Sequence, residues 1–160
     1  MHDKIVTWIQ QLNGQGLVEI DELSFNFEFV QNTLDQCQTL INQHDCRSAL
    51  DRAHTALHGY LKETCKKAEL QIIEKNPKIQ DYWSKIKQDH PKFLLDQKSN
   101  DKPINQILNA ISKSLENLYH IRNNKSSSHP NEEIIQEIEA RFVINLFRSI
   151  LQYIDQKIAN

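Results

Sequence analysis

Two residues that can act together on a phosphodiester lie near the end of the chain, Arg122 and His129 in the segment IRNNKSSSH. An arginine guanidinium presents a planar pair of N–H donors that suits two phosphate oxygens. A histidine accepts and donates protons near neutral pH. The six residues between them are all polar. This pattern is compatible with a site that holds a phosphate and moves a proton beside it.

The helix before this segment determines where Arg122 points. Apolar residues recur in steps of three and four at Ile104, Leu108, Ile111, Leu115 and Leu118. This period predicts an amphipathic helix with one buried seam. One further step of four from the last leucine reaches the arginine, which therefore faces the same inter-helix surface. A guanidinium there needs an anion or several carbonyls as acceptors.

The helix after the segment positions His129. Pro130 favours the first turn of a helix, so His129 is expected near the positive, N-terminal end of the last helix. That helix has apolar residues at every fourth position, namely Ile134, Ile138, Phe142, Leu146, Ile150, Ile154 and Ile158. The two helices that the linker joins are expected to be antiparallel neighbours, so Arg122 and His129 can converge if the linker folds back. Capping alone is the simpler interpretation, because an arginine suits a helix C-terminus and a histidine can cap an N-terminus.

The remaining pattern predicts an all-α fold, a compact up-and-down bundle of about four to six helices. With only three glycines and four prolines, the chain has few signals for hairpins. Asp45 is a plausible N-cap between two of the helices. The predicted helices span residues 2–12, 25–43, 46–75, 78–90, 104–122 and 130–158, and residues 91–102 are predicted to be a polar linker.

Composition excludes several classes of protein. The net charge of −2 is unlike the basic footprint of a dedicated duplex-binding protein. No apolar run is long enough to span a bilayer and no signal-peptide pattern opens the chain, so a cytoplasmic protein with no membrane partner is expected. The sequence has no Gly-rich phosphate loop, nucleophile elbow or paired catalytic carboxylates, which sets aside kinases, P-loop enzymes and common hydrolases.

Other residues with possible chemistry are better explained by packing. Cys37, Cys46 and Cys65 form no close pair and are expected to be buried thiols. His54 and His58 have a spacing that can bind a metal, and no third ligand is evident, although folding could bring Cys65 or His120 close. No metal or other cofactor is predicted. Four aromatic residues could stack on bases but are expected to belong to the core: Trp8, Tyr82, Trp83 and Phe93.

The segment IRNNKSSSH resembles the arginine–histidine signature of the HEPN superfamily, the higher eukaryotes and prokaryotes nucleotide-binding domains. The helix ALDRAHTALHGYLKETC and the terminal ARFVINLFRSILQYI are similar to its abortive-infection C-terminal branch, in which the motif also lies between the last two long helices. Pro130 stands where relatives often have a small residue. The resemblance covers residues 41–160, which leaves residues 1–40 as a helical extension of unknown role.

The resemblance implies a homodimer that brings two such motifs to one cleft, and a metal-independent endoribonuclease acting in antiphage defence or as a toxin. Arg122 would hold the scissile phosphate of RNA, His129 would transfer a proton, and Asn123 would orient one of these groups. Lys125, Ser126 and Ser128 are further candidate contacts to the substrate. His54 and His58 would pack or line the cleft, and an antitoxin or other defence protein could be a partner. The alternatives are a catalytically silent module that dimerises or binds a nucleotide or protein, and a helical scaffold.

Overall fold

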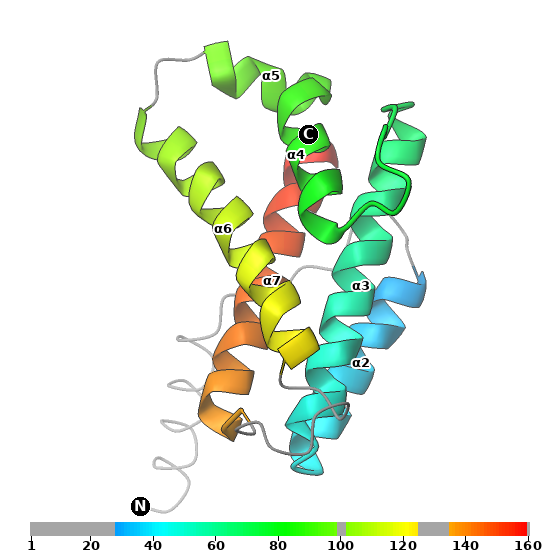
Figure 1. Ribbon diagram of the computed structural model, residues 1–160, viewed down its shortest axis with the longest axis vertical. Coiled ribbons are helices and arrows are strands. Elements are labelled where there is room, and N and C mark those ends of the chain that lie inside the picture. Colours follow the sequence, from blue (N-terminus) through cyan, green and yellow to red (C-terminus); the bar gives the residue numbers. More distant parts are fainter. Residues whose placement is uncertain (1–27, 99–101, 125–134, 160) are drawn as a thin grey trace, which may run out of the picture.

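The computed structural model describes residues 28–98, 102–124 and 135–159, and these residues form helices connected by turns, with no strand among them (Figure 1). The all-α bundle predicted from the sequence is confirmed. The predicted helix at residues 2–12 lies outside the described residues. The helices, in chain order, are α2 (Glu28–Asn42), α3 (Cys46–Lys67), α4 (Ile79–Asp89), α5 (Pro91–Lys98), α6 (Lys102–Asn124) and α7 (Glu137–Ala159).

Helix α3 is the centre of the bundle, and α2, α4, α6 and α7 all pack against it. Ala49, Ala53 and Ala56 are almost completely buried along this helix. Because an alanine side chain is small, neighbouring helices can approach the α3 backbone closely. Inside the core the Tyr60 hydroxyl donates a 2.7 Å hydrogen bond to the carboxylate of Asp155 on α7. A polar contact thus joins α3 and α7 where both side chains are removed from water.

Residues close in sequence determine where α3 begins and where it ends. The Asp45 carboxylate accepts a 3.1 Å hydrogen bond from the backbone N–H of Ser48, so the predicted N-cap is confirmed. A hydrogen bond with the Ser48 side chain, followed by this backbone hydrogen bond, lowers the pKa of Asp45. The helix ends at Lys67, earlier than the expected residue 75. Glu69 has a left-handed backbone with φ of 54°, a conformation that terminates a helix.

The segment predicted to be a polar linker contains a helix, and this prediction was wrong. Pro91 occupies the first position of α5, where its missing N–H removes no helical hydrogen bond. Phe93 is fully buried and its ring meets that of Trp83 edge to face, with 5.4 Å between centroids. The proline therefore begins a helix here, and one buried aromatic residue holds that helix on the core.

The apolar stripe of α7 is buried only in part. Phe147, Leu151 and Ile154 are buried, whereas Ile138 is 80% and Phe142 67% exposed. A step of four residues advances a side chain about 40° beyond a full helical turn. A stripe with that period therefore winds around the helix, and its first residues face away from the core that buries the later ones. The residues of this stripe therefore do not all face the same core.

Helices α6 and α7 are not each other's main neighbours. Helix α6 packs chiefly on α4 and α3, and α7 packs on α3 and α2. Leu108, Leu115 and Leu118 bury the expected seam of α6 against these partners. Ile135 and Gln136 precede α7 and are not helical, so the last helix does not run continuously from Pro130. The antiparallel pairing that we expected to bring Arg122 and His129 together is therefore replaced by two separate contacts with α3.

Several smaller expectations can also be compared with the structure. Cys37, Cys46 and Cys65 are buried free thiols, as predicted. Burial raises the pKa of Cys37 and Cys65 to about 11.

Residue 40, where we placed a domain boundary, lies within α2, and Val30 and Leu34 of that helix belong to the same core as α3. Within the described residues, no helix combines the length and the apolar character needed to cross a membrane.

Candidate functional site

Arg122 lies in the last turn of α6, where it is held by a carboxylate from α3. Its Nε donates a 3.1 Å hydrogen bond to Oδ1 of Asp51, and both side chains are about two-fifths exposed. The prediction that Arg122 faces an inter-helix surface is confirmed. Asp51 is the one hydrogen-bonding partner of Arg122 among the described residues. Asp51 thus orients the guanidinium through Nε, and no other described residue pairs with it.

A cleft of about 250 Å³ opens beside Arg122, between α3, α6 and the segment that enters α4. We call it the α3–α6 cleft. The lining residues are His54, Thr55, His58, Pro77, Lys78, Ile79, Tyr119 and Arg122. Two of them are cationic and none is acidic. Lys78 places its ammonium 4.7 Å from the centre of the Tyr119 ring, a cation–π contact. The cleft therefore combines aromatic walls with positive charge.

His54 is the most buried polar side chain in this cleft, with only 7% of its surface exposed. Its Nε2 is buried and has no hydrogen-bond partner among the described residues. Burial, followed by the nearby charges of Arg122 and His58, lowers the pKa of His54 to about 4. The imidazole is therefore neutral at physiological pH. A neutral imidazole next to an arginine can donate or accept one hydrogen bond without repelling the guanidinium.

The low pKa of His54 should make the stability of the fold depend on pH. Between about pH 4 and 6.5 the unfolded chain binds this proton more readily than the folded chain does. The contribution of His54 to the free energy of unfolding is therefore fully present above about pH 6.5 and is lost as the pH is lowered toward 4. From pH 7.5 to 5 we expect a loss on the order of 2 kcal/mol, measurable by urea unfolding.

The His54→Leu variant isolates this effect. Burial also lowers the pKa of His90, but that histidine remains in both proteins. The variant should lose less stability than the wild type over the same pH interval. Equal losses in the two proteins would contradict the assignment. Replacing the exposed His120 with leucine is the matched control and should leave the wild-type pH dependence unchanged.

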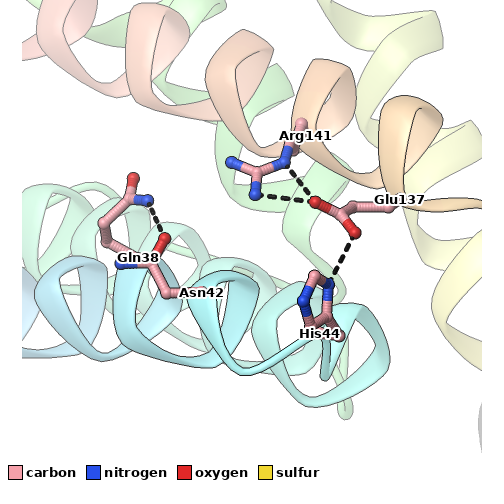
Figure 2. Close-up of polar contacts among 5 residues, drawn as sticks. All are labelled: Gln38, Asn42, His44, Glu137 and Arg141. Carbon is pink, nitrogen blue, oxygen red and sulfur yellow. Dashed lines mark hydrogen bonds and ion pairs between the residues drawn. The ribbon is translucent and has the colours of Figure 1, made fainter.

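The point where the chain enters α7 is fixed by a second polar cluster (Figure 2). Figure 2 shows Glu137 between His44, from the turn that joins α2 to α3, and Arg141, one turn further along α7. The distances are 2.9 Å from His44 Nδ1 to Glu137 Oε2 and 2.7 Å from Arg141 Nη2 to Glu137 Oε1. These contacts lower the pKa of Glu137. The start of α7 is thus tied to the α2–α3 turn.

Most of the predicted site lies outside the described residues. This applies to His129, Lys125, Ser126 and Ser128, whereas Asn123 is placed in the last turn of α6. Of the predicted catalytic residues, Arg122 is the one whose side chain is described, and Asp51 orients it. His54 and His58 line a cleft beside the arginine. Tyr82, Trp83 and Phe93 are buried core residues, also as predicted.

Sequence reasoning missed Asp51, Lys78 and Tyr119. The pairing of Asp51 with Arg122 joins residues 71 positions apart, and no local pattern indicates such a contact. One signal was present, because Asp51, His54 and His58 follow one another in steps of three and four. That spacing places them on one face of α3. The carboxylate of Asp51 thus belongs to the same row as the two histidines that were considered as metal ligands.

A family model described as a HEPN-like domain, Abi_C, matches residues 28–157. The match extends from the start of α2 almost to the end of α7, so the chain belongs to the Abi_C family of HEPN-like domains. The resemblance recognised in the sequence is confirmed at this level. Neither the curated proteins nor the solved structures gave a match.

Proposed function

We propose that this protein is a metal-independent endoribonuclease of HEPN type that acts in antiphage defence or as a toxin. The observation that carries the proposal is the placement of Arg122. Arg122 lies in the last turn of α6, the helix that precedes the segment containing His129. Asp51 accepts a hydrogen bond from its Nε, and no other described residue pairs with the guanidinium. A guanidinium held in this way can grip two phosphate oxygens.

The proposed reaction is an intramolecular transesterification of RNA. The ribose 2′-oxygen forms a bond to phosphorus and the bond from phosphorus to the 5′-oxygen breaks. His129 takes the proton of the 2′-hydroxyl or supplies the proton that the leaving 5′-oxygen needs. Arg122 stabilises the charge that develops on the non-bridging phosphate oxygens. The products are a 2′,3′-cyclic phosphate and a 5′-hydroxyl, and no cofactor is consumed.

In this proposal the remaining polar residues assist the two catalytic ones. Asn123 orients either the phosphate or the imidazole, because it follows Arg122 directly in the last turn of α6. Lys125, Ser126 and Ser128 contact the RNA backbone from the segment between the two helices. Asp51 acts as a positioning residue, since it touches the guanidinium rather than the substrate. The HEPN-like family supports this assignment in general terms.

We further propose that two copies of the chain assemble so that their Arg122 and His129 residues share one site. Ile138 and Phe142 support self-association, because they are large, apolar, exposed and one helical turn apart on α7. The alternative assembly is a complex in which a neutralising partner protein covers the toxic nuclease. Both assemblies belong to the proposal, and equilibrium sedimentation of the purified chain distinguishes a monomer from a dimer.

One observation favours a second candidate function, a catalytically silent binding module. The carboxylate of Asp51 already neutralises part of the charge of Arg122 and competes with a phosphate for it. In that case the bundle binds RNA, a nucleotide or a protein without cleaving anything. The two candidates differ in a single observable, the appearance of cut RNA.

The experiment incubates the full chain with total RNA in excess EDTA, beside the His129→Ala variant. Cleavage by the wild type that persists in EDTA and disappears in the variant is the expected result. His120→Ala serves as a matched control, because it removes an exposed histidine of α6 outside the motif. Binding without cleavage by both proteins would favour the silent module, and cleavage abolished by EDTA would contradict a metal-independent mechanism.

A further inference from the structure

The α3–α6 cleft has a charge pattern that selects an anion. Lys78 and Arg122 contribute two positive charges, and none of its lining residues carries a carboxylate. Asp51 accepts a hydrogen bond from Nε of Arg122, and no second partner of this arginine is found among the described residues. No ion pair of Lys78 is found within the described parts of the chain. Two cations at one opening favour a ligand with at least one phosphate group.

The walls of the cleft suit a flat ring. The imidazoles of His54 and His58 lie nearly parallel, with 12° between their planes and 6.0 Å between centroids. The Tyr119 ring and the apolar side chains of Pro77 and Ile79 complete the lining. A volume of about 250 Å³ is small for a whole metabolite but suits one nucleobase with part of its sugar. Unstacked bases bind proteins by stacking on rings of this kind.

His54 adds an unsatisfied hydrogen-bonding atom to the same cleft. Its Nε2 has no partner among the described residues, although the side chain is more than nine-tenths buried. A buried polar atom without a partner is unfavourable, and native structures seldom retain one without a reason. The edge of a nucleobase carries both donors and acceptors, so it can pair with the imidazole in either tautomer.

We propose that the α3–α6 cleft is a base-binding subsite that receives one unpaired nucleotide of the RNA substrate, next to the phosphate held by Arg122. This inference rests on the proposed function, because it assumes that RNA reaches Arg122. The base lies against Tyr119 and the two imidazoles, its edge pairs with His54, and Lys78 contacts a neighbouring phosphate. The enzyme is therefore selective for single-stranded RNA, because a base in a duplex cannot leave its stack to enter the cleft.

The test measures binding separately from cleavage. A fluorescein-labelled single-stranded hexaribonucleotide and the same sequence in a perfect duplex are titrated with the full-length His129→Ala protein in EDTA, and binding is followed by fluorescence anisotropy. Tyr119→Leu should weaken binding of the single strand roughly 10-fold, because stacking on the ring is lost. The duplex should bind weakly to the His129→Ala protein, with or without the Tyr119→Leu substitution. Equal binding of the duplex and the single strand would overturn the proposal.

A second variant closes the cleft without altering the core. Thr55 is exposed at the cleft, and its hydroxyl donates a 2.8 Å hydrogen bond to the carbonyl of Asp51. Thr55→Trp should fill the opening and weaken binding of the single strand by roughly 10-fold or more. Ser149→Trp on α7 is the matched control, because Ser149 is exposed and makes the equivalent 3.0 Å bond to Asn145. The control should bind normally.

Cleavage assays separate the failure of this inference from failure of the proposed function. If the wild type cleaves RNA and Thr55→Trp binds and cleaves like the wild type, the subsite is wrong and the nuclease stands. If the wild type neither binds nor cleaves RNA, both proposals fall. Adenosine monophosphate is titrated as a further probe by isothermal calorimetry. Affinity for it equal to that for the hexaribonucleotide would assign the cleft to a free nucleotide and overturn the assignment to RNA.

Discussion

Replacing Arg122 with alanine is expected to slow RNA cleavage by roughly 100- to 1,000-fold, the usual consequence of removing one preorganised donor to developing charge. The loss follows from the geometry of the side chain. Nε of Arg122 donates a 3.1 Å hydrogen bond to Oδ1 of Asp51. The guanidinium is therefore already oriented when its remaining donors contact the phosphate. Arg122→Lys should also be severely impaired, because an ammonium cannot offer a planar fork to a phosphate while Asp51 holds it.

Arg122→Ala should change the free energy of unfolding very little. The Arg122–Asp51 pair is about two-fifths exposed, and exposed ion pairs typically contribute roughly 0–1 kcal/mol. Arg141→Ala is the matched control, because Arg141 is similarly exposed and its partner Glu137 is also a carboxylate. It should cleave RNA at the wild-type rate. Equal activity in Arg122→Ala and the wild type, measured on a labelled RNA, would remove Arg122 from the mechanism.

The largest effect on folding is expected from Trp83→Ala. Trp83 has no exposed surface, its indole N–H donates a 3.0 Å hydrogen bond to Ser112 on α6, and its ring contacts Phe93 on α5. The substitution removes the residue that joins α4 to both helices and leaves a cavity. We expect a loss of about 3–5 kcal/mol in the free energy of unfolding. A loss of that size is a large part of the stability of an ordinary domain.

Urea unfolding followed by circular dichroism measures this loss. Gln88→Ala changes an exposed residue of the same helix and should stay within about 0.5 kcal/mol of the wild type. A loss below about 1 kcal/mol for Trp83→Ala would mean that the α4–α5–α6 contact is not part of the cooperative core. Ile79, the first residue of α4, lines the α3–α6 cleft, so a well-folded α4 is also needed to shape that cleft.

The sequence was sufficient to predict the bundle because helical periodicity is a local property. Leu108, Leu115 and Leu118 are buried as their spacing indicates, and the Asp45 cap is set by a neighbour three residues away. Helix α5 was missed because Pro91 was interpreted as the end of a helix, whereas proline is equally suited to begin one. The exposed Ile138 shows a related limit. Spacing indicates which residues share a face but not which part of that face a neighbour covers.

The candidate site was predictable only in part, for a similar reason. Arg122 was identified because its seam and its motif both lie within one short segment. Asp51 contacts Arg122 beside the cleft, whereas Lys78 and Tyr119 line it. The three residues come from separate parts of the chain, and their convergence depends on how α3, α4 and α6 cross. The depressed pKa of His54 has the same origin, because burial against other helices causes most of it. Such properties require the packed structure.

The most direct test of the central claim is the chemistry of the cut ends. A defined single-stranded RNA is incubated with the full-length protein in EDTA, and the fragments are analysed by mass spectrometry beside those from His129→Ala. Transesterification assisted by Arg122 and His129 predicts a 2′,3′-cyclic phosphate on one fragment and a 5′-hydroxyl on the next, with intact RNA in the variant. Fragments with 5′-phosphate ends, or the same fragments from His129→Ala, would contradict it.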